Sequence, residues 1–158
     1  MILEIYTDNL TKEDQSDHLF RSSRGIIQRN DKVLLLYSKK LDYYMLPGGR
    51  IENNETPSDC VVRELREETG FDVNAIRETL VIKEYFADST WESHFFLCET
   101  LTDKPSTISL TDEEHYLELE YKWFHYLDAL DILDAHDSAF SKASNIMQRE
   151  FLALTNSL

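Results

Sequence analysis

Three glutamates in the middle of the chain, Glu64, Glu67 and Glu68, have the residue type and spacing that divalent-cation chemistry requires. Residues three and four positions apart are neighbours on one face of a helix, so these carboxylates would lie side by side there. Their mutual repulsion must be offset, and Mg²⁺ binds through a few carboxylates together with the phosphates of a substrate. For the string RELREE alone, a solvated helix with Glu–Arg pairs is the simpler interpretation.

The segment around these glutamates carries its own helix boundaries. Thr56 is a preferred N-cap residue, Pro57 suits the first helical position, and Gly70 supplies a left-handed C-terminal stop. The sequence therefore predicts a helix over residues 57–69. Its apolar face is formed by Val61, Val62 and Leu65. The glutamates flank this face, so we expect them at the margin of the core, where a cleft can form.

The whole segment from Gly49 to Phe71, GRIENNETPSDCVVRELREETGF, resembles the Nudix box. Every fixed position of that family's pattern is present, and Phe71 stands where the family more often has Ile, Leu or Val. The preceding Leu46-Pro47-Gly48-Gly49 and the following Arg50-Ile51-Glu52 also resemble the family's usual surroundings. Family members hydrolyse a nucleoside diphosphate linked to another moiety, using Mg²⁺ or Mn²⁺.

The resemblance implies a fold and a set of metal ligands. The fold is an α/β/α sandwich with a mixed β-sheet between helices, formed by residues 1–158 as a single domain. By the same resemblance, Glu64, Glu67 and Glu68 bind metal, and the carbonyl of Gly48 is a further ligand. Arg63 is expected to orient the glutamates through a charge-assisted hydrogen bond.

The general base stays open at this point. In some Nudix enzymes it is the glutamate that matches Glu64, and in others it comes from a loop late in the domain. Here that region is TDEEHYLELE, in which Glu118 and Glu114 are the first choices and Glu113 and Glu120 the alternatives. The catalytic set expected from the sequence is Glu64, Glu68, Arg63 and Glu118.

The substrate is the least determined feature of the sequence. Arg50 and Tyr44 are the expected contacts to a small nucleotide or nucleotide-sugar diphosphate. Other aromatic residues that could stack on a base are Tyr43, Tyr85, Phe86, Trp91 and Phe96, although aromatic rings in strands are more often core. Positions 86–88 are Phe-Ala-Asp, without the proline associated with ADP-ribose hydrolases, which argues against that subclass.

Composition narrows the class of protein. A chain of 158 residues fits one domain, and a formal net charge of −14 argues against a nucleic-acid partner or an anionic membrane surface. No apolar run approaches the roughly 20 residues of a membrane span, and the first residues lack a signal peptide's basic and apolar regions. Cys60 and Cys98 make no disulfide framework. We expect a cytoplasmic location, and the sequence leaves open whether the protein forms a homodimer.

Periodicity and turn residues outline the remaining elements. Strands are predicted over residues 2–6, 18–28, 32–38, 43–46, 75–86, 92–101 and 118–125, and helices over 57–69, 127–135 and 138–154. Two other functions are alternatives to hydrolysis. One is a Nudix domain that senses a nucleotide without turnover. The other is an acidic Ca²⁺-binding protein, which lacks support because the chain has no D-x-[DN]-x-[DN]-G loop.

Overall fold

The computed structural model describes residues 1–7 and 9–158, and it has the predicted mixed α/β architecture. The strands are β1 (Ile2–Tyr6), β2 (Leu19–Arg29), β3 (Lys32–Ser38), β4 (Tyr43–Met45), β5 (Gly48–Arg50), β6 (Val73–Tyr85), β7 (Thr90–Thr100) and β8 (Leu119–His125). The helices are α1 (Pro57–Thr69), α2 (Asp112–Tyr116), α3 (Tyr126–Ala135) and α4 (Ala143–Ser157), with a short 3₁₀ turn η1 (Lys12–Asp14).

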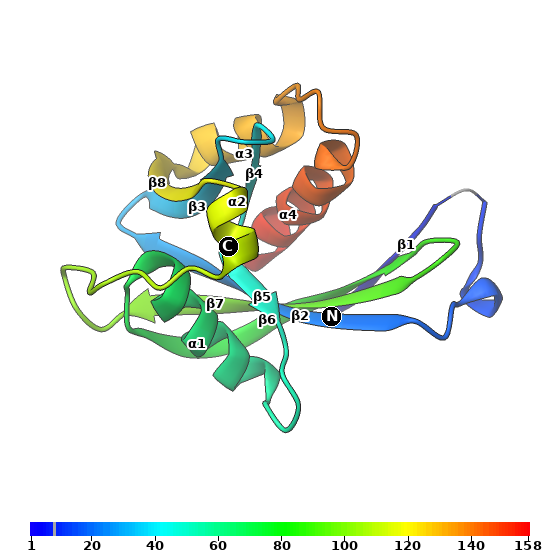
Figure 1. Ribbon diagram of the computed structural model, residues 1–158, viewed down its shortest axis with the longest axis horizontal. Helices are drawn as coiled ribbons and strands as arrows, with labels where there is room; N and C mark the ends of the chain where they lie inside the picture. Colours follow the sequence, from blue (N-terminus) through cyan, green and yellow to red (C-terminus); the bar gives the residue numbers. More distant parts are fainter. Residues whose placement is uncertain (8) are drawn as a thin grey trace.

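The strands form one connected sheet in the order β1-β6-β7-β2-β3-β4, in which β5 also pairs with β2 and β8 with β3. The β1–β6 and β2–β7 pairs are parallel, whereas β6–β7 and β3–β8 are antiparallel, so the sheet is mixed. Figure 1 shows α1 and α4 on either side of the long strands.

Two neighbouring residues of β2 show how the layers are organised. A Cβ at Gly25 would overlap Leu65 of α1, so this strand position faces α1 closely. The preceding residue, Arg24, extends its side chain to Glu150 of α4 on the opposite face. Successive strand residues point to opposite faces, so β2 is covered by a helix on each side.

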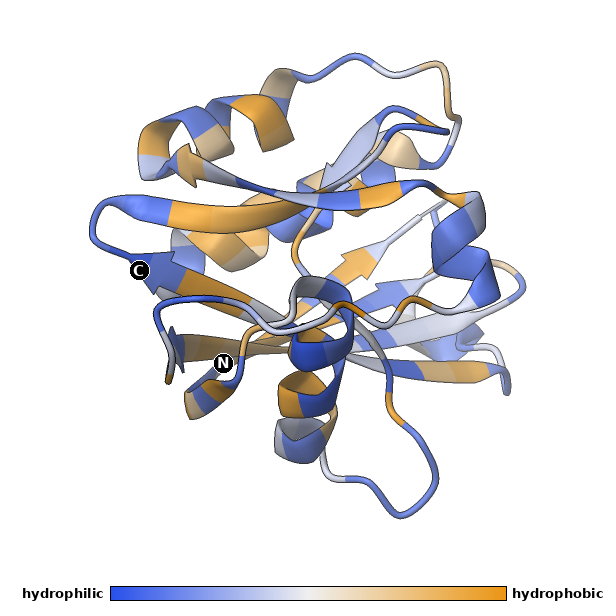
Figure 2. Ribbon diagram, turned by 60° about the vertical axis from the view of Figure 1, so that its left-hand side comes forward, coloured by the Kyte–Doolittle hydropathy of each residue, from blue (hydrophilic) through white to orange (hydrophobic). Residues whose placement is uncertain are grey.

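Each side of the sheet has its own apolar core. The larger core lies toward α3 and α4 and includes Ile26, Leu35, Leu36, Leu80, Ile82, Phe95, Met147 and Leu154. The smaller core lies under α1 and consists of Ile27, Leu34, Val61, Leu65, Phe71, Val73, Phe96 and Cys98. Figure 2 shows apolar residues along the strands and helices and mainly hydrophilic residues in the connecting loops. None of the helices in the described ranges has the length and apolarity to cross a bilayer.

The prediction of a C-terminal helix over residues 138–154 was wrong at both ends, since α4 runs from Ala143 to Ser157. Before the helix, Ser138 Oγ donates to the carbonyl of Leu41 and accepts from the amide of Phe140, which holds the chain in a turn. At the other end, Ser157 Oγ lies 2.7 Å from Thr79 Oγ1, which fixes the last helical turn on β6. The short elements β5 and α2 were not predicted from the sequence.

Candidate active site

Helix α1 has the boundaries that its sequence predicted. The hydroxyl of Thr56 accepts a hydrogen bond from the amide of Asp59 at 3.0 Å, and Pro57 occupies the first turn. Gly70 ends the helix with φ 77° and donates its amide proton to the carbonyl of Arg66 at 2.9 Å. Val61 and Leu65 are fully buried, and this packing sets the rotation of α1 that brings Glu64 and Glu68 to the margin of the core.

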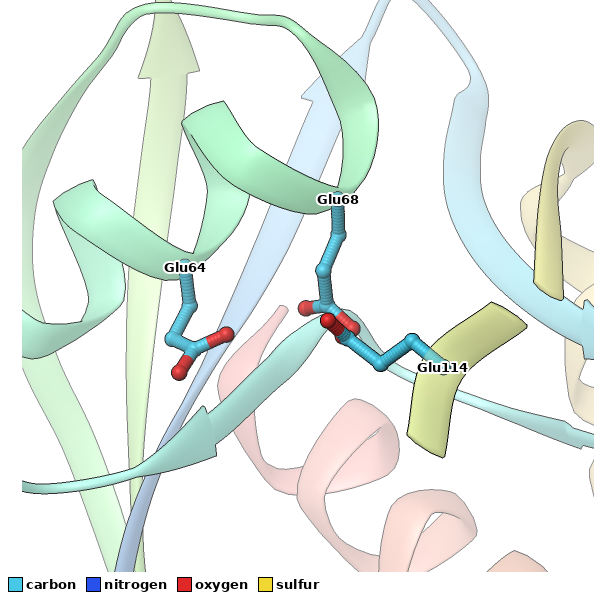
Figure 3. Close-up of side chains that lie close together, drawn as sticks. All are labelled: Glu64, Glu68 and Glu114. Carbon is cyan, nitrogen blue, oxygen red and sulfur yellow. The ribbon is translucent and has the colours of Figure 1, made fainter. Parts of the chain in front are cut away.

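Three carboxylates meet at that margin. Glu64, Glu68 and Glu114 each present an oxygen, and these oxygens lie within 4.8 Å of one another. In Figure 3, Glu64 and Glu68 project from the same helix, and the carboxyl group of Glu114 meets that of Glu68 from α2. Glu68 is only 3% exposed and Glu64 9%. Oxygen donors of this kind, in such number and proximity, fit a hard divalent cation such as Mg²⁺ or Mn²⁺.

The structure does not bring Glu118 to this group. Glu118 follows α2 with φ 53°, is exposed, and its amide donates to the carbonyl of His115. Glu120 instead forms ion pairs with Lys39 at 3.0 Å and Lys122 at 3.3 Å. Glu113 is exposed on α2. Of the four acidic residues considered in this region, Glu114 is therefore the one that faces Glu64 and Glu68.

Gly48 and Gly49 allow the backbone to approach these carboxylates closely. Glu68 Oε1 accepts a hydrogen bond from the amide of Gly48 at 2.7 Å. A Cβ at Gly48, whose φ is 155°, would overlap the carbonyl oxygen of Ser23, and a Cβ at Gly49 would overlap the carboxyl group of Glu64. Any larger residue at either position would displace a carboxylate or the strand behind it.

Arg63 forms hydrogen bonds to two of the glutamates of α1. Its Nη1 donates to Glu64 at 3.0 Å and to Glu67 at 3.3 Å, which are the contacts expected of an orienting residue. Glu67 therefore faces Arg63, and its side chain is 35% exposed. The other side of the guanidinium is held by Glu55, through contacts of 2.7 Å to Nε and 2.9 Å to Nη2.

Glu55 had no role in the sequence interpretation. The available signal was its fixed place in the Nudix box, although spacing alone did not show that it would pair with Arg63. The hydrogen bonds from Arg63 lower the pKa of Glu55 to about 2, so its carboxylate is charged over the whole physiological range.

Burial and mutual repulsion disfavour the charged forms of Glu64 and Glu68 in the absence of a cation. Burial raises the pKa of Glu64 to about 7, against an opposing effect of Arg63. Burial also raises the pKa of Glu68 well above its usual range, and the nearby carboxyl groups of Glu114 and Glu64 raise it further. Without a cation, such groups retain protons at a pH where ordinary glutamates are ionised. A divalent cation would replace those protons.

A loop over residues 101–111 carries Glu114 to the cluster. It crosses the C-terminal end of α1, where the amide of Ser106 donates to Gly70 O and the amide of Ser109 donates to Glu67 O, both at 2.7 Å. Arg29 holds the start of the loop through the carbonyls of Thr102 and Asp103. The hydroxyl of Thr111 then caps α2, so the position of Glu114 depends on a chain of backbone contacts.

The two predicted substrate contacts lie in different surroundings. Arg50 is exposed on β5, and its Cζ lies 4.6 Å from the ring centroid of Phe20 and 5.4 Å from that of Trp91. Phe20 and Trp91 stack on each other with centroids 4.5 Å apart. Tyr44 instead packs in a ring cluster with Tyr37, Phe124 and His136. Phe20 was missed because its pairing with Trp91 depends on the β2–β7 register.

Comparison with known proteins shows which family the chain resembles. An uncharacterized Nudix hydrolase from Bacillus subtilis is 43% identical over 53 residues, 34% of each chain. An ADP-ribose pyrophosphatase from Methanocaldococcus jannaschii is 45% identical over 49 residues, 29% of each chain. These alignments thus span about a third of the relatives' length. The solved structure of a NUDIX hydrolase from Nitrosomonas europaea shares the fold, with a TM-score of 0.66, 19% identity and coverage of 87% of this chain and 90% of that one. The NUDIX domain family model matches residues 19–144, which include the whole carboxylate cluster, and this protein therefore belongs to the Nudix family.

Proposed function

We propose that this protein is a metal-dependent pyrophosphohydrolase that cleaves a nucleoside diphosphate linked to another moiety. The observation that carries the proposal is the convergence of Glu64, Glu68 and Glu114 to within 4.8 Å at the margin of the core. Two of these carboxylates come from the Nudix helix and the third from a separate helix, so the fold assembles the cluster from distant parts of the chain.

In this proposal Glu64, Glu68, Glu114 and the carbonyl of Gly48 hold Mg²⁺ or Mn²⁺, with Glu67 at the edge of the group. When bound, the metal neutralises diphosphate charge and lowers the pKa of a water molecule. The protein's own part is orientation. Arg63 fixes the side chains of Glu64 and Glu67, and the two glycines leave space for the carboxyl group of Glu64 and for strand β2.

Two carboxylates are candidates for the general base, Glu64 and Glu114. A general base works best when its pKa lies near the operating pH, and burial raises the pKa of Glu64 to about 7. Glu114 lies in α2, within the segment TDEEHYLELE in which the sequence interpretation placed a late base. Because both residues are also proposed as metal ligands, kcat is compared at saturating metal, and the variant with the larger loss of kcat identifies the base.

The substrate proposed is a nucleotide with an aromatic base. The stacked rings of Phe20 and Trp91 lie beside Arg50, which is in the same short strand as Gly48. Aromatic faces and a guanidinium group next to a diphosphate site suit a nucleobase and a charged linker. A similar archaeal protein is named an ADP-ribose pyrophosphatase, so ADP-ribose belongs in the substrate panel despite the absent proline. We place the activity in the cytoplasm.

The test is hydrolysis of a panel with Mg²⁺ or Mn²⁺: ADP-ribose, nucleoside diphosphate sugars, dinucleoside polyphosphates and nucleoside triphosphates. The proposal expects release of a nucleoside monophosphate or of phosphate, with the activity lost in Glu68→Gln and kept in Glu118→Gln. Tight nucleotide binding without turnover across the panel would instead identify a sensing domain. Turnover that is unchanged in Glu68→Gln would reject the proposed site.

A further inference from the structure

Four charged side chains are buried together between the sheet and α4. They are Arg24 of β2, Glu84 of β6, and Arg149 and Glu150 of α4. Glu150 is fully buried, Glu84 is 4% exposed, Arg149 is 6% exposed, and the side chain of Arg24 is 13% exposed. The formal charges of the two guanidinium groups and the two carboxylates sum to zero. Taking charges out of water is costly, and an apolar replacement of a buried ion network often stabilises a protein, so stability alone does not account for this group.

The four side chains form a row of ion pairs that runs from β6 through α4 to β2. Glu84 contacts Arg149 at 3.4 Å, and Arg149 contacts Glu150 at 3.0 Å. The same Glu150 oxygen lies 3.5 Å from Arg24 Nε. Glu84 is therefore at one end of the chain of charges, and Arg24 is at the other end, where it meets the loop that leads into β5.

Arg24 and its neighbour hold that loop through three consecutive residues. Arg24 Nη1 donates to the carbonyl of Leu46 at 2.9 Å, and the amide of Gly25 donates to the carbonyl of Pro47 at 2.8 Å. Gly48 then pairs with Arg24 in the strand register, so closely that a Cβ on Gly48 would overlap the backbone of this strand. The loop is thus fastened immediately before the amide that binds Glu68.

One atom of Arg24 shows that its hold on Glu150 is electrostatic. Within residues 1–7 and 9–158, Arg24 Nε is buried and makes no hydrogen bond, although Glu150 lies within ion-pair distance. The guanidinium is therefore held by two hydrogen bonds from Nη1, to the carbonyl of Leu46 and to the sulfur of Met45, and by the charge of Glu150. Glu150→Gln removes that charge, and Arg24→Lys replaces the planar guanidinium, which reaches Leu46 and Glu150 together, with a single ammonium group. Either change frees the side chain from one of these restraints.

We propose that Arg24 is a positioning residue for the Gly48 segment, held in place by Glu150, so that α4 supports the carboxylate cluster from the opposite side of the sheet. This inference rests on the proposed function for its consequence in metal binding. Its structural part, the placement of the Gly48 amide against Glu68, is independent of turnover.

The test compares Arg24→Lys and Glu150→Gln with the control Glu84→Gln. This control removes a buried charge from the same network, but the ion pair of Glu84 is with Arg149 and not with Arg24. Amide hydrogen exchange of Gly48 is followed by NMR in metal-free protein, below the melting transition of each variant. In Arg24→Lys and Glu150→Gln, we expect the Gly48 amide to exchange about tenfold faster or more, relative to amides elsewhere in the sheet. In Glu84→Gln it should keep its relative protection even if the protein is less stable.

The second readout is Mn²⁺ affinity by calorimetry. Loss of a group that orients a ligand typically weakens metal binding by about tenfold to a hundredfold, and this is expected for Arg24→Lys and Glu150→Gln only. Unchanged Gly48 exchange and unchanged Mn²⁺ affinity in both variants would overturn the inference while leaving the proposed function intact. If only one of these two variants folds, its Gly48 exchange rate and Mn²⁺ affinity alone decide whether the inference holds. A wild-type protein that binds no Mn²⁺ rejects the proposed function, and the exchange result alone then judges the placement of Gly48.

Discussion

The amide of Gly48 donates a 2.7 Å hydrogen bond to Oε1 of Glu68. This contact joins the first residue of β5 to the last turn of α1, and so it fixes the backbone carbonyl and one carboxylate of the candidate site relative to each other. Glu68 is 3% exposed, and its carboxyl group also meets that of Glu114 (Figure 3). Because Gly48 has no side chain, the contact forms without displacing the neighbouring strand β2.

Replacing Glu68 with glutamine should abolish hydrolysis and yet stabilise the metal-free protein. The amide oxygen of glutamine can still accept the Gly48 bond, while the buried negative charge is gone. We expect a melting temperature above that of the wild type at pH 8 without metal, and a smaller rise when Mg²⁺ is added. Differential scanning calorimetry with and without Mg²⁺ measures both. A variant that is less stable than wild type in the absence of metal would contradict the electrostatic account of the cluster.

Stability without metal should fall as the pH rises from about 4.5 through about 7. Burial raises the pKa of Glu64 to about 7 and that of Glu68 well above its usual range. Groups with a raised folded-state pKa favour the folded state below their unfolded pKa, and this contribution is lost as pH rises through the folded pKa. Urea unfolding at a series of pH values measures the decrease. Saturating Mg²⁺ should remove most of it, since metal then compensates the carboxylate charges.

Glu55 should produce the opposite dependence in a lower pH window. The hydrogen bonds from Arg63 lower its pKa to about 2, so its stabilising effect is present above about pH 4.5 and is lost as the pH falls toward 2. Glu55→Gln should flatten this part of the stability profile and cost about 1.5–3 kcal/mol at pH 7, the range for hydrogen bonds to charged groups.

The same substitution should reduce activity by about tenfold to a hundredfold, because Arg63 then loses the partner that orients it toward Glu64. Glu52→Gln is a matched control, since Glu52 lies 3.8 Å from Arg63 and its side chain is 69% exposed. Equal losses of activity in the two variants would show that the Glu55–Arg63 contact has no special part in the site.

The loop over residues 101–111 should matter for catalysis through its backbone. Ser109→Pro removes the amide that donates to Glu67 O, while Ser109→Ala keeps it. Because this bond helps to carry Glu114 to the cluster, the proline variant should lose kcat by about tenfold or more, and the alanine variant should not. Steady-state kinetics with saturating metal distinguishes them. Similar kcat values in both variants would mean that Glu114 is positioned without this bond.

Trp91 tests the proposed surface for the base. Trp91→Leu keeps an apolar side chain but removes the ring that stacks on Phe20, so KM for a nucleotide substrate should rise about tenfold, in line with about 1–3 kcal/mol for base–aromatic stacking. Metal affinity should not change. Trp123→Leu is the control, because this ring packs against Phe71 and Arg29 instead. A higher KM in Trp123→Leu alone would mean that the nucleobase does not stack on Trp91.

The local features of the site could be predicted from the sequence, and the long-range ones could not. The caps at Thr56 and Gly70 and the buried face of α1 depend on residues within one helix, so their types and spacing sufficed. The choice between Glu114 and Glu118 depends on where the loop over residues 101–111 is fastened to α1. Similarly, β5 exists because three residues pair with β2, and no local pattern indicates that pairing.

Mn²⁺ binding to the wild type, Glu114→Gln and Glu118→Gln tests the central claim most directly. Both substitutions remove one carboxylate charge from the same short segment, but only Glu114 faces Glu64 and Glu68. Calorimetry should show that Glu114→Gln weakens Mn²⁺ binding by about tenfold or more, while Glu118→Gln binds as the wild type does. Wild-type affinity in Glu114→Gln, or weakened binding in Glu118→Gln alone, would contradict the assignment of this cluster as the metal site.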